Sequence, residues 1–445
     1  MASVFTISTP SLSAPDVVSA GPTAKPIGIY YDVAFVRFED GGMASESQEL
    51  QAAEQCITDA RTSNPSGAIV VVFIHGWHHS ARWDDEHFEQ LRTMLKSLAA
   101  REAERYTPSG QAADRRVVGV YVGWNGDPVD SLLSSLGGPF TYASFWNRSK
   151  EAETIGRGDD LRHAIGSLIA ATKDPLGLQQ SLQPVESPLV LIGHSMGALI
   201  LESAFLSLIE DPNRPLFRPS NDAPRPVETC AAGTRLAFPD VVLALNSAAD
   251  SDVFRKIRDA LTGQQFSKTV TSGGLRYAAP VLISVTSVTD HDTGRIWPLA
   301  NGPWAGRKTD GHDASLFTHD FRLEQSNVPC LPRGSIDFGQ NWHCMRPPKN
   351  LGVPMPAFPI DLPTGPRGGI PVQLVPHDRY LLTPRQPTQP HLGWVFQVPH
   401  QVIPDHNGIF NSVAASLTLG LIQLSGAVMS LATDLADTFE PLATT

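Results

Sequence analysis

The segment that decides the fold reads PLVLIGHSMGA and spans residues 188–198. Its first half is an apolar run, which is typical of a strand covered on both faces of a parallel sheet. Gly193 and Gly197 then flank Ser195, and an apolar helical pattern follows from Met196. A strand-to-helix turn this tight needs glycine on both sides of the serine, because neighbouring backbones approach closely. The turn leaves the hydroxyl above the strand end, at a helix N-terminus that favours negative charge, so the segment predicts a nucleophilic serine.

The rest of the chain repeats this alternation of strand and helix. Apolar runs that predict strands, separated by helical patterns, lie at Ile27–Phe38, Ala68–Ile74, Val117–Val122, Val241–Leu245, Val281–Val285 and Trp394–Val398. Alternation of this kind predicts βαβ units and a mostly parallel central sheet with helices on both faces. The fold class expected from the sequence is therefore α/β.

One domain is expected over residues 27–445, preceded by a flexible N-terminal arm over residues 1–26 that is rich in Ser, Pro and Ala. Residues 125–150, with several Gly, Ser and Leu, form a candidate cap segment. A Pro/Gly-rich excursion covers residues 301–391, before the last strand. Twelve prolines fall in residues 347–390 of this stretch, so we expect little regular structure there.

Composition limits the class of protein and its partners. The chain has 445 residues, of which 41% are hydrophobic, as in a soluble globular protein. It carries 34 Lys and Arg against 45 Asp and Glu, a net charge of −11, which argues against nucleic acid as a partner. No basic residue precedes Lys25, so no secretory signal is evident and a cytoplasmic location is expected. The uncharged stretch Asn407–Thr433 predicts a buried C-terminal helix, with docking to a membrane or a partner as the alternative.

Around Ser195 the chain resembles the α/β-hydrolase superfamily, and within it an esterase/lipase-like branch. A second point of resemblance follows the strand Ile69–Ile74, where the tripeptide of residues 75–77, HGW, is similar to the oxyanion-hole loop of that family. The resemblance implies an α/β-hydrolase fold from about residue 27. It also implies an oxyanion hole made by the backbone N–H groups of Trp77 and Met196, and donors of this kind each contribute about 10²- to 10³-fold in rate.

The catalytic residues of that family come in the order serine, acid, histidine. The acid should follow a late strand, and our choice is Asp290, with Asp292 as the second candidate. Asp250 and Asp252, after the strand Val241–Leu245, are further alternatives. Each of these aspartates also fits an ordinary turn or helix cap.

The histidine should lie on the loop between the last strand and the C-terminal helix. His406 occupies that place, and His400 is its competitor. A histidine there can take the proton of Ser195 and return it to the leaving group while the acid holds its tautomer. His75 and His194 flank the motifs instead, and we expect them to brace loops.

Aromatic residues near the predicted strand ends are candidates for the substrate pocket, since such pockets are mainly apolar. The residues that we predict to line it are His78, Trp124, Phe140 and Trp146. The alternative is that the aromatic side chains pack a helix near residues 142–155 onto the sheet, and that His78 is simply an exposed loop residue.

Metal binding is not indicated by any spacing in the chain. The clusters around residues 290–292, 310–313 and 319–320 contain Asp and His, but no HExxH or paired CxxC spacing occurs. Four scattered cysteines do not make a disulfide framework, although Cys330 and Cys344 form a candidate pair in an oxidising compartment.

The function expected from these features is a serine carboxylic-ester hydrolase that works through an acyl-enzyme and needs no cofactor. Its triad would be Ser195, His406 and Asp290, and its substrate a small-molecule or lipid ester. A lipase, phospholipase or membrane-associated acyltransferase would use the same residues. A non-catalytic binding protein on a hydrolase scaffold is the competitor from another class.

Overall fold

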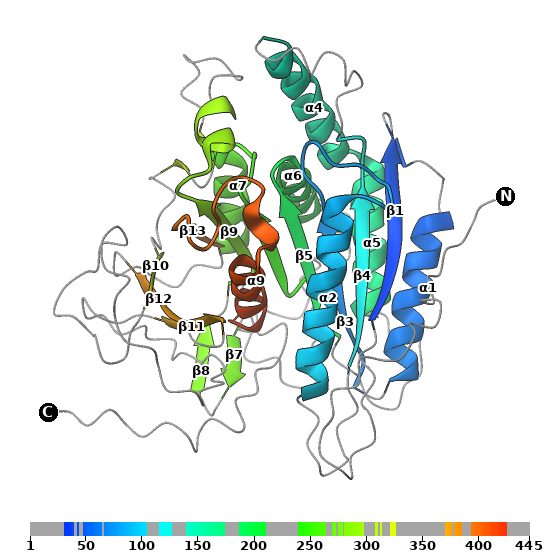
Figure 1. Cartoon of the computed structure of the whole chain (residues 1–445). Coiled ribbons are helices and arrows are strands. Elements are labelled where there is room, and N and C mark those ends of the chain that lie inside the picture. Colours follow the sequence, from blue (N-terminus) through cyan, green and yellow to red (C-terminus); the bar gives the residue numbers. More distant parts are fainter. Residues whose placement is uncertain are drawn as a thin grey trace, which may run out of the picture. The chain divides into compact units, whose positions relative to one another are not determined.

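The computed structural model describes residues 31–39, 42–43, 48–64, 66–104, 115–126, 139–173, 187–210, 239–263, 269–272, 275–278, 280–297, 308–309, 312–313, 321–325, 370–375, 378–384 and 393–424. The chain divides into two compact units. Unit 1 is Met1–Arg218 with Arg235–Pro239, and unit 2 is Pro219–Thr234 with Asp240–Thr445. Figure 1 labels most of their helices and strands.

Unit 1 contains five strands of the central sheet, in the order β2-β1-β4-β3-β5. Its strands are β1 (Tyr31–Glu39), β2 (Gly42–Met43), β3 (Ala68–Ile74), β4 (Arg116–Gly123) and β5 (Leu189–His194). All pairs are parallel except the short β1–β2 pair. Every residue of β3 and β5 is buried, as expected for central strands covered on both faces.

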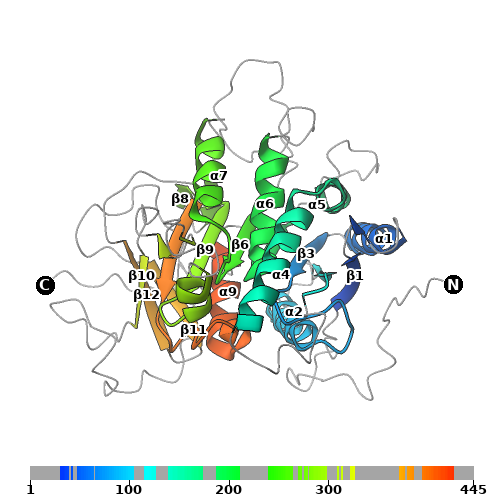
Figure 2. The ribbon, with the colours of Figure 1, turned by 90° about the horizontal axis from the view of Figure 1, so that it is seen from above.

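Helices cover both faces of this sheet. They are α1 (Gln48–Ser63), α2 (Glu86–Glu104), α4 (Pro139–Arg157), α5 (Asp159–Lys173) and α6 (Met196–Glu210). Helices α1, α5 and α6 pack side by side, α4 packs on α5 and α6, and α2 lies on the opposite face of the strands (Figure 2). Helix α5 shows why these segments are helical. Its buried positions 161, 164, 165, 168 and 169 form one face, with two aspartates in the first turn and a lysine in the last.

Unit 2 contains the strand order β6-β9-β13-β10-β12-β11. The bounds are β6 (Val241–Leu245), β9 (Leu282–Ser287), β13 (Gly393–Val398), β10 (Phe321–Gln325), β12 (Asp378–Pro384) and β11 (Ile370–Val375). The first four strands are parallel, and β12 and β11 continue the sheet in antiparallel pairing. Helix α7 (Ser251–Gly263) contacts β13, helix α9 (Ser412–Leu424) contacts β11, and β7 (Thr269–Ser272) pairs with β8 (Leu275–Ala278).

The expectation of an α/β fold with mostly parallel strands is confirmed in both units. The expectation of little regular structure in residues 347–390 is wrong where β11 and β12 lie, and β10 is a further strand of the 301–391 excursion. The prolines of these strands sit where a missing N–H is tolerated, because Pro371 is in the edge strand β11 and Pro384 is the last residue of β12.

Several expectations fall wholly or partly outside the described residues. These are the N-terminal arm, residues 127–138 of the candidate cap, most of the 301–391 excursion, and residues 425–433 of the C-terminal stretch, where the described helix ends at Leu424. Within the ranges given above, no helix combines the length and the apolar character needed to cross a bilayer.

Candidate active site

Ser195 stands at the junction of β5 and α6 in unit 1. Its backbone has a φ of 55°, in the left-handed region that residues with a side chain rarely adopt, and the residue is only 4% exposed. The carbonyl of Ser195 accepts hydrogen bonds from the N–H groups of Ala198 (3.0 Å) and Leu199 (3.2 Å), which starts the helix at once. A left-handed L-residue costs about 1 kcal/mol. Strain of this kind clusters at functional sites, because it persists only where the surrounding structure holds it.

The glycines beside Ser195 are required by contact with neighbouring backbone. A Cβ atom on Gly193 would lie 2.6 Å from the Cα of Ala198, and one on Gly197 would overlap the carbonyl oxygens of Ile74 and His75. The turn therefore presses against the end of β3. This close approach is the reason for the glycine spacing seen in the sequence.

The loop after β3 runs alongside Ser195. In the parallel register Ile74 pairs with Gly193, so the next residues of the two strands continue side by side. A Cβ atom on Gly76 would lie 2.9 Å from the Cβ of Ser195. The structure thus brings the Gly76–Trp77 peptide next to the serine and places Met196, which is fully buried, directly after it. These are the two backbone positions predicted for an oxyanion hole.

His75 fixes the direction of that peptide. The backbone N–H of Trp124 donates to His75 Nε2 (2.9 Å), so the ring proton is on Nδ1, which donates to the Gly76 carbonyl (2.9 Å). Complete burial is the largest effect on this ring and lowers the pKa of His75 to about 4, which keeps it neutral. Because the Gly76 carbonyl and the Trp77 N–H belong to one planar trans peptide, they point in opposite directions. His75 therefore orients the Trp77 N–H.

The residues predicted to line the pocket have different surroundings. Trp124 has no exposed surface, stacks on His75, and donates from its indole nitrogen to the His75 carbonyl (2.8 Å). It therefore braces the loop and presents no exposed surface to a substrate, in contrast to our expectation. His78 is exposed, has a φ of 65° and stacks on Trp77 at 3.9 Å between ring centroids. Phe140 and Trp146 lie in α4, but their side chains are outside the described part of the structure.

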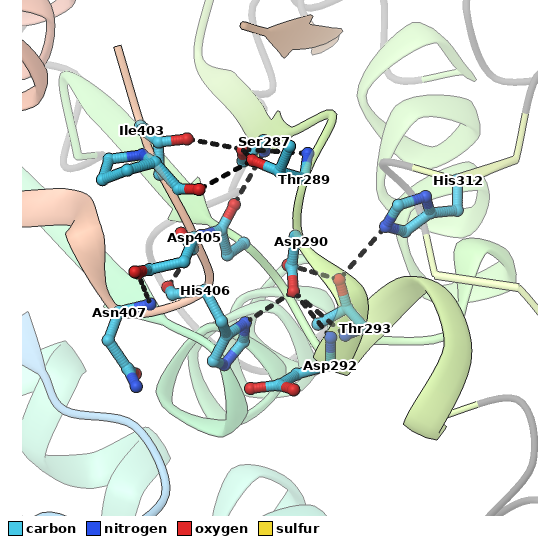
Figure 3. A network of polar contacts seen from close by, with 12 residues as sticks. Ser287, Thr289, Asp290, Asp292, Thr293, His312, Ile403, Asp405, His406 and Asn407 are labelled. Carbon is cyan, nitrogen blue, oxygen red and sulfur yellow. Dashed lines mark hydrogen bonds and ion pairs between the residues drawn. The ribbon is translucent and has the colours of Figure 1, made fainter. Parts of the chain in front are cut away.

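Unit 2 brings together the predicted acid and histidine. The parallel register pairs Ser287 at the end of β9 with Val398 at the end of β13, so the following loops lie on the same edge. His406 Nδ1 is 2.9 Å from Asp290 Oδ1 (Figure 3). The Asp290 side chain is fully buried, whereas that of His406 is 11% exposed.

Asp290 is held as an acceptor by several donors. Its Oδ1 also accepts the backbone N–H groups of Asp292 (3.1 Å) and Thr293 (3.2 Å), and its Oδ2 accepts the Thr293 hydroxyl. Burial by itself would raise the pKa of Asp290, but the hydrogen bonds from His406 and Thr293 bring it below its ordinary value. The carboxyl group is therefore ionised at neutral pH, and His406 donates from Nδ1.

The same surroundings act on His406 in the opposite direction. Burial would lower the pKa of the ring, but the hydrogen bond to Asp290 and the negative charges of Asp290, Asp292 and Asp405 raise it above its ordinary value. A histidine so placed is a stronger base than free imidazole. It can also hold the positive charge that it gains on accepting a proton.

The competing candidates have other partners. Asp250 Oδ1 accepts the N–H of Asp252 (3.0 Å) at the start of α7, and Asp252 forms an ion pair with Arg255. His400 is exposed. Asp292 acts on the His406–Asp290 pair in two ways. Its backbone N–H donates to Asp290, and its negative charge raises the pKa of His406.

Residues that the sequence did not single out hold the His406 loop. Asn246, buried and with a φ of 46°, donates to the His406 carbonyl (2.8 Å) and accepts the N–H of Ser287 (2.9 Å). The hydroxyls of Ser287 and Thr289 donate to the carbonyls of Ile403 (2.6 Å) and Pro404 (2.8 Å). The only signal in the sequence was the position of Asn246 directly after a predicted strand.

The remaining candidates from the sequence are metal ligands and cysteines. The residues that the structure describes contain no group of three or more His, Cys, Asp or Glu side chains arranged to hold a metal ion. Cys330 and Cys344 lie outside the described residues, and Cys56 is a free thiol whose pKa burial raises to about 11.

Comparison of the chain with known proteins found no match. No family model, curated protein or solved structure matches the chain.

Proposed function

We propose that the protein is a serine hydrolase of carboxylic esters with an α/β-hydrolase fold. The observation that carries the proposal is the buried His406–Asp290 pair, in which the carboxylate fixes the tautomer of a histidine with a raised pKa. Ser195, on its strained strand-to-helix turn, supplies the matching nucleophile of unit 1. The proposal requires the two units to act together.

In the proposed reaction, Ser195 Oγ bonds to the ester carbonyl carbon while His406 Nε2 takes the hydroxyl proton. The N–H groups of Trp77 and Met196 stabilise the negative charge on the carbonyl oxygen. The bond to the alcohol then breaks, and His406 returns the proton to the alcohol as it leaves. Water repeats the sequence on the acyl-enzyme, which releases the acid and restores the serine. Asp290 keeps His406 in the required tautomer throughout, and no cofactor takes part.

The substrate class proposed is a small-molecule or lipid ester. Rates on p-nitrophenyl esters of increasing acyl length, measured on the wild type and on Ser195→Ala together, test the proposal. We expect turnover that is lost in Ser195→Ala by about 10⁴-fold or more. An optimum at short acyl chains would indicate an esterase and one at long chains a lipase. Equal turnover in both proteins would contradict the proposal, because another nucleophile would then be responsible.

A further inference from the structure

A buried carboxylate lies at the far end of the loop that carries Trp77. The side chain of Asp85 is 7% exposed and precedes helix α2 by one residue. Its Oδ1 accepts the N–H of His87 (2.9 Å), which is the hydrogen bond of an ordinary helix N-cap. Asp85 accepts further hydrogen bonds besides this cap, and these indicate a second role.

Two residues of the loop bind Asp85 directly. His79 Nδ1 lies 3.1 Å from its Oδ1, and the Ser80 N–H (2.8 Å) and hydroxyl (3.3 Å) donate to its Oδ2. Burial would raise the pKa of Asp85, but the hydrogen bonds from His79 and Ser80 lower it to about 2. Asp85 therefore stays charged at neutral pH, and its hydrogen bonds to His79 and Ser80 hold the loop at the start of α2.

A further donor reaches Asp85 from β4. The hydroxyl of Tyr121 lies 3.1 Å from Asp85 Oδ1, and the Tyr121 ring stacks on His75 with centroids 5.5 Å apart. His75 in turn donates to the Gly76 carbonyl, in the same peptide as the Trp77 N–H. Asp85 is thus linked to this peptide along the chain through His79 and through space by way of Tyr121.

We propose that Asp85 is a positioning residue, which holds the loop of residues 75–80 so that the Trp77 N–H points to the oxyanion. This inference rests on the proposed function for its effect on rate. A carboxylate fits the task because four donor groups from the loop and β4 reach it, and an ionised acceptor makes each hydrogen bond shorter and stronger than a neutral one. A simple helix cap would need only the bond to His87.

The test compares Asp85→Asn with two control variants of the full chain. Asp85→Asn keeps the shape but removes the charge, whereas Asp84→Asn changes the neighbouring carboxylate, which is 44% exposed and paired with Arg82. Glu102→Gln removes the charge of a buried ion pair with Arg115 in the second half of the same helix, and so serves as a control for stability alone. Steady-state kinetics on an ester and hydrogen exchange of residues 75–80 are measured well below the unfolding temperature of every variant.

We expect Asp85→Asn to lower kcat by about 10-fold or more while KM changes by less than about 2-fold, because an oxyanion donor acts mainly in the transition state. Exchange of the loop should rise in this variant and in neither Asp84→Asn nor Glu102→Gln. Tyr121→Phe, which removes a single donor and keeps the ring, should give the same pattern with a fall in kcat of roughly 3-fold. This milder variant keeps the test available if Asp85→Asn does not fold.

Unchanged loop exchange in Asp85→Asn and Tyr121→Phe would overturn the inference. So would increased exchange with unchanged kcat, or an equal fall of kcat in Glu102→Gln. If the wild type has no activity that depends on Ser195, the proposed function fails separately. The exchange result then decides alone whether Asp85 holds the loop.

Discussion

The turn around Ser195 in unit 1 and the loop around His406 in unit 2 are held in place by different means. At Ser195 the geometry comes from backbone packed against backbone, with glycines where a Cβ would collide. At His406 it comes from polar side chains that bridge loops, with Asn246, Ser287 and Thr289 bonded to carbonyls. We therefore expect that an added methyl group disturbs the Ser195 turn most, whereas the loss of a polar side-chain group disturbs the His406 loop most.

The largest effect is expected at the acid. Asp290→Asn should lower turnover by about 10⁴-fold with little change in fold, because the amide no longer selects the tautomer of His406 that accepts a proton from serine. Ester hydrolysis and circular dichroism measure the two quantities. Asp292→Asn is the matched control, since its backbone N–H to Asp290 remains. If Asp292→Asn or Asp250→Asn gives the larger loss, the choice of Asp290 is wrong.

The turn of unit 1 is tested by adding one methyl group. Gly197→Ala should lower the free energy of unfolding by about 3 kcal/mol or more, because the new Cβ overlaps two carbonyl oxygens that belong to the end of β3. Gly158→Ala, where the nearest atoms would be 3.2 Å away, should cost less. Urea unfolding of the two variants gives the comparison, and equal stability would mean that close packing does not hold this turn.

His75 and His406 should respond to pH with opposite signs. The pKa of His75 is lowered to about 4 in the folded chain, so the unfolded chain binds more protons between pH 4 and 6.5, and stability falls as the pH falls through this window. The expected loss is on the order of 2 kcal/mol. The pKa of His406 is raised, so its contribution is present below pH 6.5 and is lost as the pH rises through the folded value.

Urea unfolding at pH 4.5 and 7 measures the contribution of His75, with His75→Gln as the comparison. The wild type should lose more stability than the variant between these two pH values. An identical loss in both proteins would show that His75 is not held neutral by its burial.

The smallest effect is expected at Asn246. Asn246→Ala should cost about 1 to 2 kcal/mol, because the N–H of Ser287 and the carbonyl of His406 lose a buried partner, and kcat should fall as His406 shifts. Asn64→Ala removes a hydrogen bond to the N–H of Ser66 in a turn of unit 1 and should cost about 1 kcal/mol or less with kcat unchanged. Thermal unfolding and kinetics of both variants separate the two roles. Equal kcat values would show that Asn246 does not position the loop.

Much of the architecture could be predicted because local patterns dominate it. Strand β3 and the first four residues of β5 are continuously apolar, which identifies them as buried strands. Ser195 was chosen from the turn that follows β5. Asp290 and His406 were chosen from the ends of late strands together with the residue order that the family resemblance implies, and the roles of all three stay predictions. The strands β10, β11 and β12 could not be predicted for two reasons. Strand β10 pairs with β12, which lies far along the chain, and β11 and β12 form a hairpin in a stretch whose prolines argue against strands.

The residues that support the candidate site could not be predicted from the sequence, because their hydrogen-bond partners lie far away along the chain. Asn246 binds the carbonyl of a residue 160 positions away, and Tyr121 binds Asp85 across 36 positions. A polar residue at a strand end or a helix start is common, and its partner is set only by tertiary packing. The burial of Trp124 was missed because an aromatic residue after a strand fits a pocket and a loop support equally well.

The most direct test of the central claim is the rate at which a fluorophosphonate modifies Ser195, measured against pH in the wild type and in His406→Ala. We predict that peptide mapping finds the label on Ser195 and that the wild-type rate rises with pH through a pKa above 6.5, because His406 must be neutral to accept the proton. Labelling of His406→Ala should be slower by about 10³-fold or more. Equal labelling of both proteins, or an unlabelled Ser195 in the wild type, would contradict the account.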